Sequence, residues 1–135
     1  MSRIELSRVG FTPFQRLLGH NVDIMNKWSD LGDELEKTLS LSTQLKEEVR
    51  RVLAEKNGCA YCKAKGAPNW KQQDEKTMLA IAFTDVFLKE KESVPDTAFV
   101  VLKEAFNDKE ISELCAFICF TTASQYYGAM LDLQP

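Results

Sequence analysis

The sequence has no long apolar run and no concentration of positive charge. A helix that crosses a membrane needs about 20 consecutive apolar residues, and the apolar stretches here are much shorter. The first residues, MSRIELSRVG, lack the apolar segment of a signal peptide. Lys and Arg number 17 against 20 Asp and Glu, the two signs are interleaved, and the net charge is −3. These absences predict a cytoplasmic protein that has neither a membrane nor a nucleic acid as its partner.

Strict alternation of apolar and polar residues, which would indicate β-strands, is hard to find. Apolar residues instead recur at steps of three and four, which predicts an all-α fold. The 135 residues, 44% of them hydrophobic, suit one compact domain over residues 1–135 with six to seven helices. Capping residues are expected to mark the helix boundaries, at Thr12 and Pro13, Asn21, Asn57 and Gly58, Asp96, and Asn107 with Glu110.

Two of the expected helices carry long apolar stripes. One stripe follows Asn21. The other lies on the last helix and includes two of the four cysteines, which are therefore expected to be buried and to stay reduced. The stripes are Ile24, Trp28, Leu31, Leu35 and Leu39, and Ile111, Leu114, Cys115, Ile118 and Cys119.

The other two cysteines, Cys59 and Cys62, lie in the stretch GCAYCKAKG. In a reducing compartment a close pair is more typical of catalytic, redox or metal chemistry than of a structural disulfide. Gly58 is expected to cap a short helix, and the unpaired N–H groups and the dipole at a helix start stabilise a thiolate. Lys63 and Lys65 add positive charge, so the local sequence favours reactive sulfur.

These two thiols can fill a helix contact, bind a metal or form a disulfide. Cβ atoms three residues apart on a helix lie roughly 5–6 Å from each other, whereas a disulfide requires about 3.5–4.5 Å, so a bridge should be easily reduced. Zinc would need three or four ligands. Because Cys115 and Cys119 are expected in the core, no metal site is predicted. His20, the only histidine, is expected at a helix boundary.

One motif extends beyond the cysteines: Glu47, eleven intervening residues, then Cys59-Ala-Tyr-Cys62. This motif resembles the centre of the carboxymuconolactone decarboxylase and alkylhydroperoxidase D (AhpD-like) family. The similarity extends over LLGHNVDIMNKWSDLGDEL, LKEEVRRVLAEKNGCAYCKAKG, KTMLAIAFTDVFL and FNDKEISELCAFICF, in the family's order. It implies a compact AhpD-like helical domain without a cofactor. It also implies a homo-oligomer, a trimer or hexamer, with the site near subunit contacts.

The resemblance implies a role for three residues. Glu47 would drive proton transfer, Cys59 would donate a proton and serve as the resolving thiol, and Cys62 would be the thiol that a hydroperoxide attacks. Attack requires a thiolate, and a second thiol must capture the sulfenic acid that forms. Position in the helix alone would instead favour Cys59 as the more acidic thiol. The assignment of Cys62 as the attacking thiol therefore follows the resemblance.

The sequence departs from the peroxidase branch of the family at one position. That branch has CxxCxxxH, and the histidine is replaced here by Gly66. Glu47 can reach the sulfur through water, or Tyr61 or His20 can supply the missing group. By helical phase Glu48 is the alternative to Glu47 as the acid. A histidine introduced at position 66 is expected to raise the rate of peroxide reduction if the family's geometry is kept.

The predicted function is that of a CxxC thiol-dependent antioxidant enzyme, in which a redox-active cysteine pair reduces a hydroperoxide. Such an enzyme requires a hydroperoxide or disulfide substrate and an external dithiol reductant. The alternatives are a redox sensor or disulfide reductase without peroxidase activity. A carboxymuconolactone decarboxylase-like protein is a further alternative, although that branch does not rely on this cysteine pair.

Overall fold

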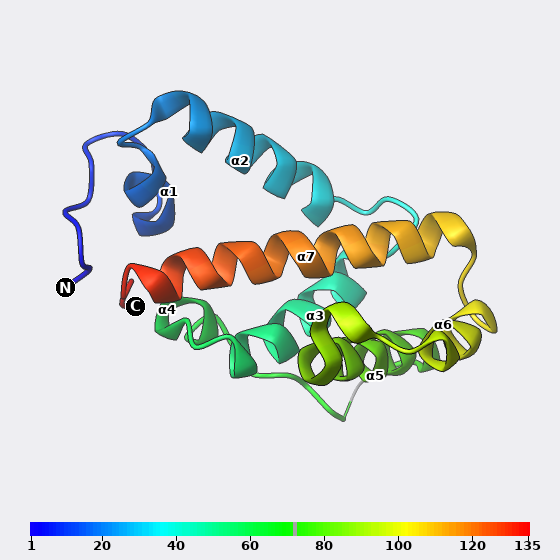
Figure 1. Ribbon diagram of the computed structural model, residues 1–135. Helices are drawn as coiled ribbons and strands as arrows, with labels where there is room; N and C mark the ends of the chain where they lie inside the picture. The colour runs from blue at the N-terminus through cyan, green and yellow to red at the C-terminus, as the bar shows by residue number, and fades with distance from the viewer. Residues whose placement is uncertain (72) are drawn as a thin grey trace.

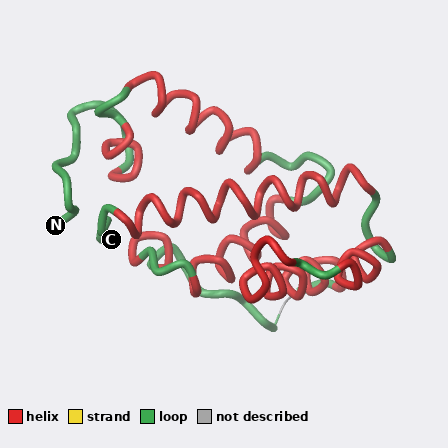
Figure 2. The backbone as a smooth tube through the Cα atoms, in the orientation of Figure 1, coloured by secondary structure: helices red, strands yellow, loops and turns green. Residues whose placement is uncertain are grey.

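A computed structural model describes residues 1–71 and 73–135, and within them it contains helices and no strand (Figure 2). The prediction of an all-α fold with six to seven helices is confirmed, since the described residues form seven α-helices and one short 3₁₀ helix. The elements are α1 (Pro13–Leu18), α2 (Val22–Glu36), α3 (Thr43–Lys56), α4 (Ala60–Lys63), α5 (Glu75–Glu90), η1 (Lys91–Ser93), α6 (Asp96–Lys103) and α7 (Asp108–Met130).

Capping boxes begin α1 and α7. The sequence predicted a helix start at both places and a capping box only at Asn107. The Thr12 side chain accepts a hydrogen bond from the Gln15 backbone N–H, and the Gln15 side chain accepts one from the Thr12 N–H. Asn107 and Glu110 make the same reciprocal pair at the start of α7. Each box satisfies N–H groups that have no partner within the helix, which fixes where the helix begins.

Asp96 does not hold its expected capping position, and Asn21 is the expected N-cap of α2 but makes no side-chain capping bond. Asp96 is the first residue of α6, and Pro95 with its extended backbone holds the capping position. An acidic residue in the first turn still interacts favourably with the helix dipole, so Asp96 supports α6 without capping it.

The long helix α7 occupies the middle of the molecule (Figure 1). Helices α1 and α2 lie on one side of it, and α3, α4, α5 and α6 lie on the other, with the two ends of the chain close together at one end. Helix α3 contacts both α5 and α7, while α4 contacts α3 and α7. This arrangement places the cysteine segment of α4 between α3 and the last turns of α7.

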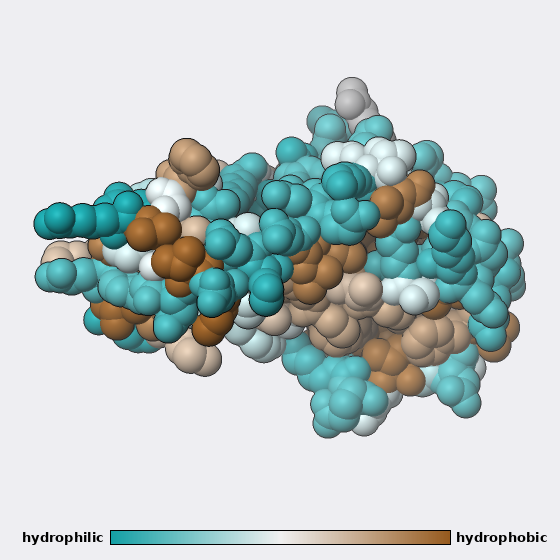
Figure 3. All heavy atoms as spheres, turned by 90° about the horizontal axis from the view of Figure 1, so that it is seen from above, coloured by the Kyte–Doolittle hydropathy of each residue, from teal (hydrophilic) through white to brown (hydrophobic). Residues whose placement is uncertain are grey.

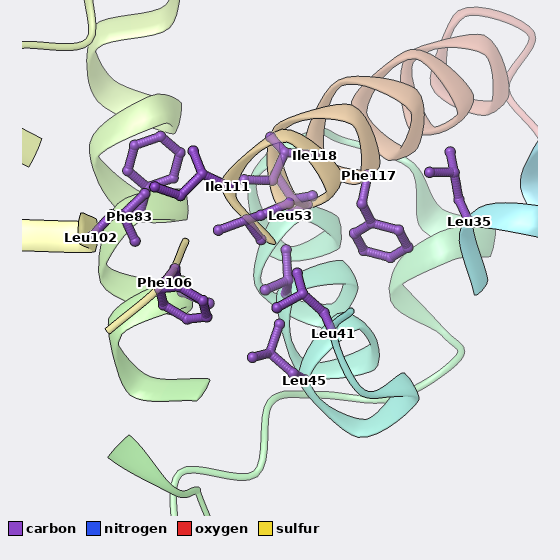
Figure 4. Packing of buried hydrophobic residues seen from close by; sticks show 13 residues of the cluster. Leu35, Leu41, Leu45, Leu53, Phe83, Leu102, Phe106, Ile111, Phe117 and Ile118 are labelled. Carbon is purple, nitrogen blue, oxygen red and sulfur yellow. The ribbon is translucent and has the colours of Figure 1, made fainter. Parts of the chain in front are cut away.

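The main core lies between α3, α5, α6 and the first half of α7 (Figure 4). Val49, Leu53 and Leu114 have no exposed surface, and the rings of Phe83 and Phe99 meet edge to face with centroids 5.2 Å apart. Full burial of such side chains is worth about 1.5–3 kcal/mol each. The core includes Leu35, Leu41, Leu45, Leu53, Phe83, Leu102, Phe106, Ile111, Phe117 and Ile118.

A buried ion pair joins α3 to α7 at the edge of this core. Lys46 Nζ lies 2.8 Å from Glu113 Oε2, and both side chains are almost fully buried. Lys46 also donates to the Lys37 carbonyl, while Glu113 accepts from the backbone N–H groups of Ser40 and Leu41. Burial acts to raise the pKa of Glu113, but the hydrogen bonds and the charge of Lys46 outweigh it and lower this pKa. The pair therefore holds the segment between α2 and α3 against α7.

The apolar stripe of α2 is only partly buried. Ile24 and Leu31 are 52% and 51% exposed, whereas Leu35 is buried against the core. Trp28 lies on the side facing α7, where its ring is 5.6 Å from that of Phe120. The face seen from above, on the side of α2, shows apolar patches, some near the middle and some at the outline, interspersed with hydrophilic residues (Figure 3). Helix α2 thus covers α7 along one side and leaves part of its own stripe uncovered.

The prediction that Cys115 and Cys119 are buried was wrong. Both are free thiols, Cys119 is exposed, and Cys115 is half-buried with a pKa raised by burial and by the neighbouring Cys119. Neighbouring helices cover α7 on its other sides, so one line of residues at steps of four and three stays open. These exposed residues are Ser112, Ala116, Cys119, Ala123, Tyr126 and Met130.

Candidate redox site

Cys59 and Cys62 are joined in a disulfide, and their Cα atoms lie 5.2 Å apart. The helix α4 begins one residue later than the sequence suggested, because Cys59 and not Gly58 is its N-cap. Gly58 has φ +72°, a left-handed conformation that suits glycine in the turn after α3. Cys59 has the extended backbone of a cap, and its Sγ accepts a hydrogen bond from the Cys62 N–H at 3.2 Å.

The disulfide is buried against α7. Only 1% of Cys59 and 7% of Cys62 is exposed, and Ala54 of α3 and Ala129 of α7 contact the pair. A Cβ atom added at Gly128 of α7 would lie 2.8 Å from Cys59 Sγ and 3.8 Å from Cys62 Sγ. The absence of a side chain at Gly128 therefore allows α7 to approach the sulfur atoms this closely.

Cys62 also lies in the wall of a cavity of about 200 Å³ between α1, α2, α3, α4 and α7, whereas Cys59 is not among the cavity's lining residues. Thus one cysteine of the pair faces this space and the other faces Gly128. Polar groups beside Cys62 include Arg50, Lys65 and Gln125. Most of the apolar wall consists of Phe14, Trp28, Leu35, Phe117 and Phe120.

Glu47 is held by two arginines on its own helix. Arg50 donates to both carboxylate oxygens at 2.7 and 2.9 Å, and Arg51 Nε donates to Oε1 at 3.2 Å. Partial burial acts to raise the pKa of Glu47, but the hydrogen bonds and charges of Arg50 and Arg51 prevail and lower it below 4.5. Glu47 is therefore a carboxylate at neutral pH. It lines a second cavity, of about 220 Å³, that shares Arg50 and Lys65 with the first.

Arg50 connects Glu47 to the cysteine segment. Its Nη1 donates to the Cys62 carbonyl at 3.1 Å. The Arg50 carbonyl in turn accepts from Gln125 Nε2 of α7 at 3.2 Å, and Gln125 Oε1 accepts from buried Asn57 at 2.8 Å. Sequence reasoning missed Arg50, Gln125 and Gly128, although the interval of three residues from Glu47 to Arg50 is a signal for a helical ion pair.

Glu48 occupies a different environment from Glu47. It is buried and accepts hydrogen bonds from Arg51 Nη1 at 3.0 Å, the Asn69 N–H at 2.9 Å and Gln73 Nε2 at 3.1 Å. It lines neither of the two cavities. These contacts hold the segment that follows α4 against α3.

The two auxiliary residues suggested by the sequence lie apart. Tyr61 lines the cavity beside Cys62, and the ammonium of Lys65 lies 4.8 Å from the centre of its ring. His20 lies in the exposed turn between α1 and α2, where its Nε2 donates to the Glu5 carbonyl at 2.6 Å. His20 lines neither cavity, so the structure brings Tyr61 to the cysteines and places His20 elsewhere.

Gly66 occupies the position of the motif histidine, and its φ of +132° is a conformation that L side chains rarely adopt. A Cβ atom there would lie 3.4–3.6 Å from the guanidinium of Arg51. A histidine introduced at this position would be accompanied by backbone strain and would face Arg51. The substitution that the sequence suggested therefore changes stability as well as chemistry.

Within residues 1–71 and 73–135, no group of three or more His, Cys, Asp or Glu side chains is placed to hold a metal ion. The same residues include no helix that is long and apolar enough to cross a membrane.

Neither a protein-family profile nor a curated protein sequence matches the chain. Its fold is similar to the crystal structure described as an uncharacterized peroxidase-related protein from Silicibacter sp. TM1040, with a TM-score of 0.78 and 17% sequence identity. The similarity covers 90% of this chain and 74% of the other. The expected AhpD-like helical fold is thereby confirmed.

Proposed function

We propose that the protein is a CxxC thiol peroxidase, in which Cys62 attacks a hydroperoxide and Cys59 resolves the product. The observation that carries this proposal is the unequal placement of the two sulfurs. Cys62 lies in the wall of a cavity that can admit a small organic molecule, and Cys59 lies behind it against Gly128. The similarity of fold to a peroxidase-related protein supports a redox role in general, without specifying the reaction.

The proposed reaction has three balanced steps. The Cys62 thiolate attacks the terminal oxygen of the hydroperoxide, so that an S–O bond forms and the O–O bond breaks, and the alkoxide takes up a proton to leave as an alcohol. The Cys59 thiol then attacks the sulfenic sulfur, which forms the disulfide and releases water. An external dithiol reduces the disulfide by two exchange steps and is itself oxidised to a disulfide.

Glu47 takes part in this scheme as a carboxylate. Its lowered pKa makes it a proton acceptor and not a proton donor at neutral pH. We propose that it receives the proton released by the Cys62 thiol through water in the two cavities, whose walls share Arg50 and Lys65, in place of the direct histidine relay that Gly66 removes. Tyr61, in the wall of the same cavity, is proposed to orient the peroxide.

The test is steady-state turnover of an organic hydroperoxide with dithiothreitol as reductant. Cys62→Ser should abolish turnover, and Cys59→Ser should slow it to the rate at which dithiothreitol itself reduces the Cys62 sulfenic acid. Cys119→Ser is the matched control, since this free thiol is exposed on α7 and its loss should leave the rate unchanged. Rapid disulfide exchange without peroxide consumption would reject the peroxidase proposal and favour a disulfide reductase.

A redox sensor is a second candidate that one observation favours. Because Cys59 Sγ lies against Gly128, we propose that formation and reduction of the disulfide change the packing of α7. A sensor would show different hydrogen exchange in α7 between the two redox states and no catalytic turnover.

A further inference from the structure

The helix that carries Cys62 does little to stabilise a thiolate at that residue. Helix α4 has only four residues, and its N-cap position belongs to Cys59, whose own sulfur accepts the Cys62 N–H. Cys62 is the third residue of this short helix. Because the dipole effect is confined to the start of a helix and scales with aligned peptides, another group must supply the positive field that a reactive thiolate requires.

The charged groups around the cavity come from three parts of the chain. Helix α3 contributes Arg50, the segment after α4 contributes Lys65, and α2 contributes Asp33 and Glu36. The parts of α1 and α7 that line the cavity contribute no charged side chain. Of the two cations, Arg50 contacts the cysteine segment directly, since its Nη1 donates to the Cys62 carbonyl at 3.1 Å.

Arg50 is the cation that the structure fixes in place. Its side chain is 14% exposed, and Nε, Nη1 and Nη2 all make hydrogen bonds. Lys65, by contrast, is an exposed residue at the surface. A planar guanidinium held by a bidentate carboxylate loses little further freedom when an anion forms beside it.

The ion pair between Arg50 and Glu47 has a direction. Arg50 lines the cavity that contains Cys62, while Glu47 lines only the second cavity. Arg50 also lines the second cavity, but it is the member of the pair that contacts Cys62, through the hydrogen bond to the Cys62 carbonyl, so the cation lies nearer to Cys62 than the carboxylate does. A cation nearer to Cys62 than its partner carboxylate favours the thiolate, although Asp33 and Glu36 in the cavity wall oppose it.

We infer that Arg50 is a positioning residue that stabilises the Cys62 thiolate, and that the negative charge of Glu47 partly offsets this effect. The inference rests on the proposed function only in taking Cys62 as the attacking thiol. It assigns to an arginine on α3 the task that the missing histidine would otherwise perform, and it explains why the absence of a histidine at position 66 is compatible with reactive sulfur.

The experiment measures the pH dependence of iodoacetamide alkylation of Cys62 in reduced protein with Cys59, Cys115 and Cys119 replaced by Ser. Serine is itself a good N-cap, so Cys59→Ser preserves the start of α4. A neighbouring opposite charge shifts a pKa by about 1–3 units, and the pairing with Glu47 weakens this effect. We therefore expect Arg50→Gln to slow alkylation at pH 7 by about three- to tenfold.

Three further variants make the result specific. Arg51→Gln removes the same charge from the next residue, which does not line the Cys62 cavity, and should change the rate less than twofold. Arg50→Lys should restore part of the lost rate. Glu47→Gln should leave the alkylation pKa of Cys62 unchanged or lower it, because the positive charge of Arg50 is then uncompensated.

Equal effects of Arg50→Gln and Arg51→Gln, or a Cys62 pKa that rises in Glu47→Gln, would overturn the inference. If Arg50→Gln does not fold, Arg50→Lys and Glu47→Gln provide the test. A Cys62 pKa that rises in Glu47→Gln would then overturn the inference. Alkylation requires no peroxide, so absence of turnover would reject the proposed function and leave this result standing. If the parent protein is an active peroxidase and Arg50→Gln leaves the Cys62 pKa unchanged, only the role of Arg50 is rejected.

Discussion

Replacement of Gly128 by alanine should weaken the oxidised form of the protein more than the reduced form. The added Cβ would lie 2.8 Å from Cys59 Sγ, a separation at which one of the two atoms must move. In the disulfide the sulfur is held by its bond to Cys62, whereas the reduced side chain can rotate away. Overpacking of this kind costs about 1–3 kcal/mol, while alanine in a helix is favoured over glycine by about 0.5–1 kcal/mol.

The propensity gain applies to both redox states and cancels in their difference. The oxidised form should therefore lose about 1–3 kcal/mol relative to the reduced form, which raises the reduction potential by about 20–65 mV. Equilibration with dithiothreitol or glutathione buffers measures this potential, and thermal unfolding of both forms measures the stabilities. Gly32→Ala on α2 is the control, since its Cβ would meet only the ring of Phe120, at 3.3 Å. An unchanged potential in a folded Gly128→Ala protein would contradict this expectation.

Three further outcomes are expected. Glu113→Ala should lower the free energy of unfolding by about 3–5 kcal/mol, because it leaves Lys46 buried without its partner. The pKa of Glu113 is lowered in the folded protein, so the stabilisation by this pair is present above pH 4.5 and is lost as the pH falls through the folded pKa. The free energy of unfolding, measured by urea titration, should therefore fall less steeply with decreasing pH in the variant than in the parent. Thiol labelling of the folded protein should modify exposed Cys119 before half-buried Cys115, and equal rates would contradict the described packing. Sedimentation should show a homo-oligomer that Tyr126→Lys on the exposed line of α7 dissociates, whereas a monomeric parent at micromolar concentration would exclude this assembly.

Local sequence rules predicted the features of this fold that depend on neighbouring residues. The starts of α1 and α7 and the ends of α3 follow from hydrogen bonds within a few residues, so they could be read from the sequence. The phase of α3 likewise indicated that Glu48 lies nearer the apolar side than Glu47, and Glu48 is the more buried of the two.

Features that depend on distant parts of the chain could not be predicted in this way. The stripe containing Cys115 and Cys119 has helical periodicity, but periodicity does not reveal whether another helix covers it, and none of the described residues covers Cys119. The contact between Gly128 and the disulfide depends on how α7 passes α4. The place of Arg50 beside Cys62 depends on the packing of α3 against α4.

A single-turnover experiment on reduced Cys59→Ser protein tests directly whether Cys62 is the thiol that attacks the hydroperoxide. An organic hydroperoxide is added in equimolar amount, a dimedone probe traps sulfenic acid, and peptide mass spectrometry locates the adduct. An adduct on Cys62 is expected, formed together with one equivalent of alcohol, with none on Cys115 or Cys119. An adduct confined to Cys119, or consumption of peroxide by Cys62→Ser protein at the parent rate, would contradict this role of Cys62.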